Sequence, residues 1–156
     1  MWITQLVVHH SHRGKSYASS LLRFLIVSGN PATVGIASSH PHAILAVQSA
    51  SKAIFDEQFI RTQLVETIKI CKIPYLVDKP LIGSLVSHSS DSEDGIRLQI
   101  DTGFYTDHSG PLQALRNLPT EVNWPLGPLL DGHEFIAIFA VGSRRDTPRS
   151  QVNAKE

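Results

Sequence analysis

The first 26 residues constrain this chain most, because an apolar stretch runs through a short polar turn directly into an amphipathic helix. Residues 3–8 (ITQLVV) are mostly apolar or β-branched, and such a run predicts a strand buried on both faces of a sheet. From residue 17 onward, apolar side chains recur at helical spacing, at Ala18, Leu21, Leu22, Leu25 and Ile26. The pattern therefore predicts a strand over 3–8, a polar turn and then a helix.

The polar turn lies where a helix begins, and a helix N-terminus offers unpaired N–H groups and the positive end of the helix dipole. Gly14 lets the chain bend tightly, while Ser16 and Ala18 are small enough for a phosphate to approach the backbone. Arg13 and Lys15 add positive charge. We expect this turn to bind an anion, most naturally a phosphate.

Two kinds of phosphate-binding loop compete for this turn. The triplet Gly14, Lys15, Ser16 resembles the nucleotide P-loop, which requires a further glycine where this chain has His9. The run RGKSYA (13–18) resembles the signature of the GNAT-type N-acetyltransferase superfamily, which is Arg or Gln, two residues, Gly, one residue, then Gly or Ala. Serine 16 replaces the first of those small residues, which narrows the approach to the amide but keeps its N–H.

The resemblance extends along most of the chain. A predicted strand over 33–37 and a predicted helix over 41–52 follow in the order of that superfamily. The runs SSHPHAILA, YLVDKPLIGSL, DTGF, WPLG and DGHEF are similar to a group of uncharacterised fungal acetyltransferase-like proteins. The resemblance implies an α/β (α+β) fold with a GNAT-like mixed sheet, and acetyl-CoA as the donor of an acetyl group to a primary amine.

The resemblance also implies which residues hold acetyl-CoA. In the superfamily two parallel strands splay apart, and the pantetheine arm pairs with their free backbone groups; residues 5–8 and 35–38 would line that gap here. His40 takes the place of an asparagine that contacts the cofactor. The expected cofactor contacts are Leu6, Val7, Val8, Arg13, Gly14, Lys15, Ser16, Tyr17, Ala18, Ser19 and His40.

The catalytic groups are less well defined by the sequence. Val47 takes the place of a tyrosine that protonates the leaving thiolate, which leaves Ser38, Ser39, His40 or His42 as substitutes. The general base is often a carboxylate, but residues 2–12 contain none, so the histidines at the expected strand end become candidates. The candidate catalytic residues are His9, His10 and His40, with Asp101, Tyr105, Asp107, His108 and Glu134 as alternatives on later segments.

A complete acetyltransferase of this type places three strands and two helices before the signature strand, which here follows Met1 almost at once. We therefore expect the domain at 1–142 to be partial, with an unprotected strand edge. A fragment, a rebuilt fold or a covering partner chain each accounts for this, and a homodimer through that edge is one form of the last. The rival function is a catalytically inactive CoA-binding remnant.

Composition excludes several classes. The formal net charge is zero and 42% of residues are hydrophobic, which fits a folded domain and argues against a general binder of nucleic acid or anionic membranes. Cys71 is the only cysteine, so no intrachain disulfide forms. We expect a cytoplasmic protein, with the nucleus as an alternative. His10 and His12 can share a face, but two ligands are too few for a zinc site, so no metal is expected.

The remaining segments have simple patterns. A helix over 55–71 is predicted with Asp56 as its cap, followed by an irregular stretch over 75–86 and a polar surface loop over 87–95. Alternation over 96–105 and an apolar run over 135–141 predict two late strands, with a short helix at 112–118 and a loop at 124–132 between them. Residues 143–156 are expected to form a disordered tail.

Overall fold

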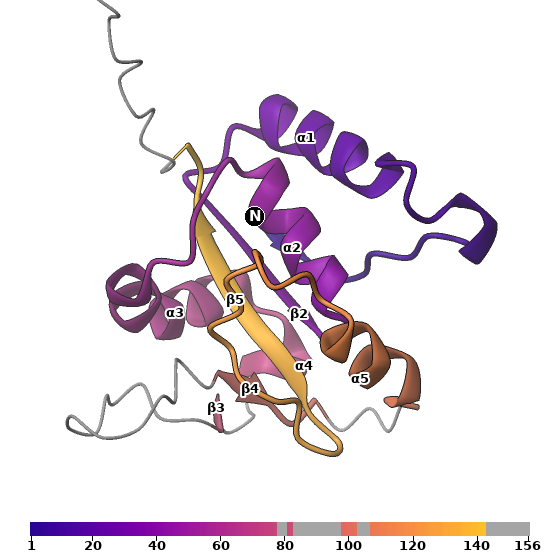
Figure 1. Cartoon of the computed structure of the whole chain (residues 1–156). Helices are drawn as coiled ribbons and strands as arrows, with labels where there is room; N and C mark the ends of the chain where they lie inside the picture. The colour runs from indigo at the N-terminus through magenta and orange to yellow at the C-terminus, as the bar shows by residue number, and fades with distance from the viewer. Residues whose placement is uncertain (78–80, 83–97, 103–106, 143–156) are drawn as a thin grey trace, which may run out of the picture.

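A computed structural model describes residues 1–77, 81–82, 98–102 and 107–142, which form one mixed sheet flanked by helices (Figure 1). The strands in the sheet order are β1 (Trp2–Ile3), β2 (Thr33–Ser38), β5 (Glu134–Ala140), β4 (Gln99–Ile100) and β3 (Leu81–Ile82). The helices are α1 (Tyr17–Gly29), α2 (Pro41–Ala50), α3 (Glu57–Cys71), α4 (Pro74–Val77) and α5 (Ser109–Arg116), with a 3-10 turn, η1 (His10–His12). The predicted α+β class with a mixed sheet is confirmed.

Strands β2 and β5 form the centre of the sheet. They pair antiparallel over six residue pairs, from Thr33 opposite Ala140 to Ser38 opposite Phe135. β1 pairs parallel with β2, and β4 and β3 continue antiparallel on the other side of β5. The antiparallel pairing of the two late strands agrees with the sequence pattern. Among the described strands, β1 is an edge strand with one neighbour.

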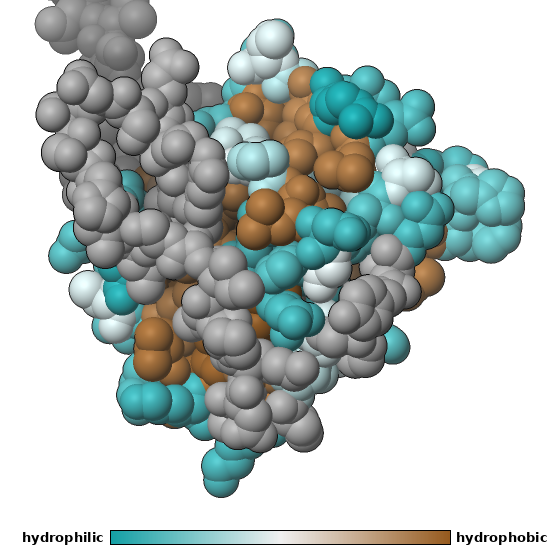
Figure 2. All heavy atoms as spheres, turned by 90° about the horizontal axis from the view of Figure 1, so that it is seen from below, coloured by the Kyte–Doolittle hydropathy of each residue, from teal (hydrophilic) through white to brown (hydrophobic). Residues whose placement is uncertain are grey.

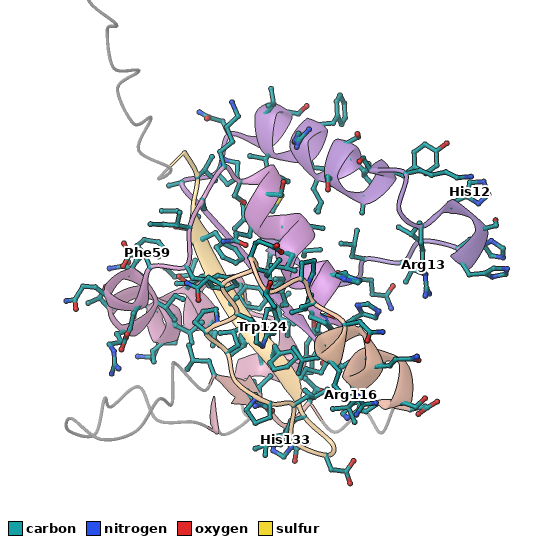
Figure 3. All side chains as sticks on the ribbon, in the orientation of Figure 1. His12, Arg13, Phe59, Arg116, Trp124 and His133 are labelled. Atoms are coloured by element: carbon teal, nitrogen blue, oxygen red, sulfur yellow. The ribbon has the colours of Figure 1, made fainter. Side chains whose placement is uncertain are left out.

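Helices cover both faces of the sheet: α1 and α2 lie on one face, and α3 lies on the other (Figure 1). Along β5, Phe135, Ala137 and Phe139 belong to the core shared with α1 and α2, whereas Ile136 and Ile138 belong to the core under α3. Alternation of a fully apolar strand therefore places apolar side chains in both layers. Trp124, at the centre of Figure 3, contacts the ring of Phe135 with 4.9 Å between centroids.

The helix boundaries follow from their capping residues. The Asp56 carboxylate accepts a hydrogen bond of 2.9 Å from the N–H of Phe59, so Asp56 is the predicted cap and α3 begins after it at Glu57, two residues later than predicted. The predicted short helix at 112–118 instead begins at Ser109, because Asp107 accepts hydrogen bonds from both the N–H and the hydroxyl of Ser109. The helix also ends earlier than predicted, at Arg116.

The predicted strand over 3–8 is wrong beyond Ile3. Only Trp2 and Ile3 pair with β2, and the chain then leaves the sheet, with Thr4 and Gln5 exposed and Val7 86% exposed. An apolar run forms a strand only where a neighbour accepts its hydrogen bonds, and no described strand lies on the outer side of this segment. The segment therefore extends alone toward η1, which projects from the side of the molecule (Figure 1).

Several predictions concern segments that lie wholly or partly outside the described residues. The polar loop over 87–95, the tail over 143–156 and the outer parts of the strand over 96–105 lie outside the described residues. The stretch expected to be irregular contains the short helix α4 and strand β3. None of the described helices is both long enough and apolar enough to cross a membrane.

The contact between Trp2 and Gly35 holds β1 on β2 and can be tested. A Cβ atom on Gly35 would overlap the six-membered ring of Trp2, so Gly35→Ala should lower the free energy of unfolding by about 1–3 kcal/mol in urea denaturation. Gly110→Ala is the matched control, since open space surrounds Gly110. Adding Trp2→Ala should recover part of the loss. An equal cost of Gly35→Ala with and without Trp2 would contradict the contact.

Candidate functional site

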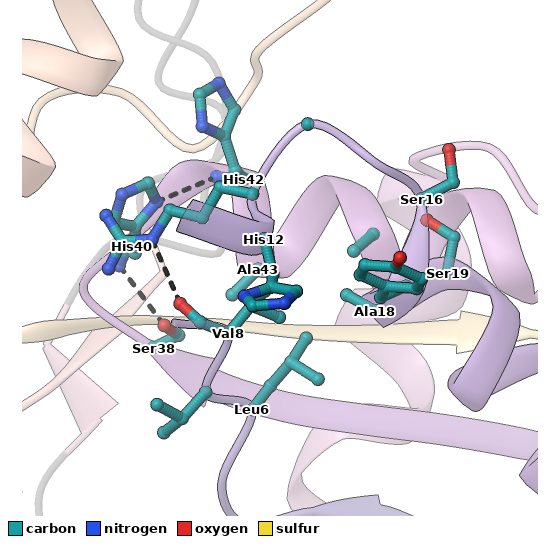
Figure 4. Close-up of a pocket in the computed structure, with 15 residues that line it drawn as sticks. Leu6, Val8, His12, Ser16, Ala18, Ser19, Ser38, His40, His42 and Ala43 are labelled. Carbon is teal, nitrogen blue, oxygen red and sulfur yellow. Dashed lines mark hydrogen bonds between the residues drawn. The ribbon is translucent and has the colours of Figure 1, made fainter. Parts of the chain in front are cut away.

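A cavity of about 780 Å³ opens where the segment after β1 diverges from β2 (Figure 4). Its walls come from that segment, the start of α1, the end of β2 and the first turns of α2. The lining residues are Leu6, Val7, Val8, His12, Arg13, Gly14, Ser16, Tyr17, Ala18, Ser19, Ser38, His40, His42, Ala43 and Ala46. Ten of the eleven cofactor contacts expected from the sequence therefore lie around one hollow. Lys15 is the exception, and it is exposed.

The turn before α1 adopts backbone conformations that keep its amides open. Gly14 has φ +71° and Ser16 has φ +59°, both in the left-handed region. The first backbone bond of the helix runs from the Ser20 N–H to the Ser16 carbonyl oxygen at 2.9 Å. Among the described residues, no acceptor receives the N–H groups of residues 17–19, and the Ser16 side chain makes no capping bond. These donors are therefore available at the cavity wall.

Arg13 lines the cavity and also stabilises the protruding loop, which consists of residues 9–12. Its Nε donates a hydrogen bond of 3.1 Å to the Val8 carbonyl oxygen, which ties the two ends of the protruding loop together (Figure 4). The guanidinium thereby remains at the cavity, and its charge acts on His40 across it. Arg13 thus has a positioning role in addition to its charge, which the sequence pattern did not indicate.

His40 caps α2 from the opposite wall. Its Nδ1 accepts the backbone N–H of His42 at 3.3 Å, and its own backbone N–H donates to the Ser38 hydroxyl at 3.2 Å. In the neutral ring this leaves the hydrogen on Nε2. Partial burial, the charge of His42 and the charge of Arg13 lower the pKa of His40 below 6.5. His40 is therefore neutral at pH 7 and can donate a hydrogen bond through Nε2.

The α2 wall carries small apolar side chains beyond His40. Ala43 and Ala46 line the cavity, whereas Val47 is fully buried in the core between α2 and the sheet. Val47, which takes the place of the tyrosine in the resemblance, therefore faces the core of this chain and not the cavity. Neither alanine can donate a proton. Ala46 lies one helical turn beyond Ala43, a spacing from which it could have been found.

His9 and His10 do not reach the cavity. Both are exposed on the protruding loop, together with Ser11 and His12, and the loop extends as a hydrophilic projection (Figures 2 and 3). The Ser11 hydroxyl bridges the Nδ1 atoms of His9 and His12 at 2.9 and 2.8 Å. Of these histidines, only His12 lines the cavity. In the described ranges, no group of three or more His, Cys, Asp or Glu side chains could hold a metal ion.

Four of the alternative acid–base candidates lie in the described part of the chain, and none of these lines the cavity. The exposed Asp107 carboxylate accepts two hydrogen bonds from Ser109, and these bonds lower the pKa of Asp107. His108 is buried, and its Nε2 has no hydrogen-bond partner. Glu134 and Asp101 sit near the end of the sheet where β2 finishes, because Glu134 pairs with Ile100 beside Phe135. Tyr105 lies outside the described residues.

A scan against protein-family models and searches of the curated proteins and the solved structures found no match to this chain. The interpretation of the site therefore depends on its own geometry.

Ser16 should behave as a position built for glycine. A left-handed backbone costs about 1–2 kcal/mol for a residue with a side chain, so Ser16→Gly should raise the free energy of unfolding by about 0.5–1 kcal/mol. Ser20→Gly, an exposed site inside α1, should lower it by a similar amount. Thermal or urea denaturation of the two variants compares them directly. A loss of stability in both would show that Ser16 is unstrained.

Proposed function

We propose that this chain binds acetyl-CoA in the cavity and transfers its acetyl group to a primary amine, as a GNAT-like N-acetyltransferase domain. The observation that carries the proposal is that residues 17–19, whose amides have no acceptor in the described protein, line a cavity between a diverging segment and β2. A pyrophosphate needs a concave surface of N–H donors with nearby positive charge. Gly14, Ser16 and Arg13 supply the bend, the small side chain and the charge.

The rest of the cavity suits an extended, mostly apolar arm that carries amide groups. After Ile3 the segment bearing Leu6, Val7 and Val8 has left β2, so its backbone groups no longer pair with that strand. Ser38 and the two alanines of α2 form the opposite wall. An arm such as pantetheine can therefore pair with the free backbone and pack on aliphatic side chains. The reactive thioester would then lie near Leu6 and Ala46.

The transfer itself needs positioning, polarisation and proton movement. The deprotonated amine attacks the thioester carbonyl, the C–S bond breaks, the amine loses a proton and the thiolate gains one. In this proposal a backbone N–H of Val8 or Leu6 stabilises the developing oxyanion. The Nε2–H of His40 lies on the cavity wall and can hydrogen-bond the departing sulfur. His9 and His10 remain proposed bases only for an acceptor that binds over the protruding loop.

A second candidate function is binding of CoA without catalysis. This function is favoured by the cavity face of α2, where Ala43 and Ala46 provide no proton donor, and by the exposed positions of His9 and His10. β1 has an open edge among the described strands, and the outer side of α1 exposes Leu21, Phe24 and Val27. Both features are compatible with a protein that pairs with another chain, such as a second copy of itself.

A substitution that blocks the amides tests the cofactor site. Ala18 lines the cavity at the first turn of α1, so Ala18→Phe should weaken CoA binding about tenfold or more in isothermal titration calorimetry. Ser20→Phe places the same side chain on an exposed position one half-turn away and should leave the affinity unchanged. Thermal denaturation of both variants verifies folding. Equal affinities for CoA in the two variants would contradict a site at this turn.

Turnover separates the two functions. Free thiol released from acetyl-CoA in the presence of a panel of primary amines reports acetyl transfer, with mass spectrometry of the acetylated amine as confirmation. We expect release that depends on both the amine and the intact cavity, and that Ala18→Phe abolishes. CoA binding without thiol release for any amine would support the non-catalytic module.

A further inference from the structure

Helix α1 carries apolar side chains on two opposite faces. On the inner face, Leu22 and Ile26 are buried in the core shared with α2 and the sheet. Phe24 is two residues from Ile26, which places it about 200° around the helix, on the outer face. A surface helix usually turns a polar face outward, whereas a helix that is apolar all round is covered on all sides. The composition of α1 therefore indicates that its outer face also has a covering surface.

Four large apolar side chains form this outer face. Their exposed fractions are 54% for Leu21, 67% for Phe24, 40% for Leu25 and 80% for Val27. α1 lies at the periphery of the molecule, with this face turned away from α2 and the sheet (Figure 1). We propose that the outer face of α1 is the contact surface of a homodimer, in which the same faces of two copies pack against each other.

This surface is separate from the cavity. None of its four apolar side chains lines the cavity, which α1 borders only through its first turn. The homodimer is therefore independent of the identity of the ligand, and the dimer and the acetyl-CoA site can each be tested without the other.

The exposed area of the outer face is close to what a specific dimer requires. The four side chains expose on the order of 400 Å² of apolar surface on each copy. Two copies would bury on the order of 800 Å² of it, which corresponds to about 1,200–1,400 Å² once the polar rim is included. This total lies at the lower end of the range for specific interfaces, so we expect a dimer with a dissociation constant in the micromolar range.

The charges of α1 favour a second copy over a lipid surface. Arg23 is the only charged residue in the helix, and it lies about 100° around the helix from Phe24, at the side of the outer face. Two such faces can meet without burying a charge that lacks a partner. A helix that lies on a membrane has many basic residues around its apolar face, and α1 has one.

The C-terminal residues of the chain are a poor alternative cover for this face. Residues 143–156 read SRRDTPRSQVNAKE, in which Val152 is the only large apolar residue. A segment of this composition buries too little apolar surface to cover four large side chains. A second copy supplies the same four side chains, and a two-fold axis brings each set against the other.

Sedimentation velocity of the full chain, from about 1 µM to about 100 µM, tests the proposal. We expect a monomer at the low end and a dimer at the high end. Phe24→Glu should weaken dimerisation about tenfold or more, because its carboxylate would lose water against an apolar surface. Ile70→Glu is the matched control, since Ile70 is 70% exposed on α3, on the opposite face of the sheet, and this variant should still dimerise. Circular dichroism verifies that both variants fold.

A second measurement needs no variant. Hydroxyl-radical oxidation of the wild-type chain should decrease at Phe24 as the protein concentration rises, while oxidation at Ile70 stays constant. Equal oxidation of Phe24 at both ends of the concentration range would contradict burial of the outer face.

Three other results would overturn the homodimer through α1. The first is a monomer at about 100 µM, whether or not the chain binds phosphatidylserine vesicles, which test for a lipid surface. The second is a dimer of equal strength in Phe24→Glu, which would locate the contact elsewhere, such as the open edge of β1. The third is an equal loss in Phe24→Glu and Ile70→Glu. Calorimetric titration of the same proteins with CoA reports on the acetyl-CoA site separately.

Discussion

The parallel pairing of β1 with β2 ends after two residue pairs, and the cavity depends on where it ends. Trp2 packs on Gly35 and Ile3 stands opposite Ile36, after which the two chains separate. Antiparallel pairing of β2 with β5 continues undisturbed on the other side. β2 is therefore paired along its whole length on one side, and on the other side only over the two pairs with β1. A hollow between two diverging segments offers backbone groups that no strand has used.

The start of α1 completes this hollow with donors. A helix that begins at a left-handed residue cannot use a side-chain cap of the usual kind, and Ser16 makes none. The first-turn amides then depend on solvent or on a ligand for hydrogen bonds. α2 begins differently, since His40 accepts from the amide of His42 and satisfies it. Of the two helix starts at the cavity, α1 offers open N–H donors and α2 offers the neutral, partly buried imidazole of His40.

The sequence predicted correctly those features that depend on interactions between residues close together in the chain. Helical spacing with Asp56 as a cap gave α3, and small residues beside Gly14 indicated an open turn, because these signals act within a few residues. The strand over 3–8 was wrong because pairing is a property of two chains, and apolar composition does not say whether a neighbour is present. Ala46 and Val47 show the same limit on α2, where one residue of helical rotation decides which side chain faces the cavity and which the core.

The hydrogen bond between Arg13 and the Val8 carbonyl oxygen closes the base of the protruding loop over 9–12. Residues 9–12 project from the body of the protein, and the Arg13 side chain connects the residues on either side of them. Changes in its length or composition can be accommodated in solvent without displacing Gly14 or the amides behind it. The histidine-rich loop over 9–12 is therefore the part of this surface that can most easily acquire a separate recognition role. The Arg13–Val8 hydrogen bond meanwhile maintains the cavity wall beside it.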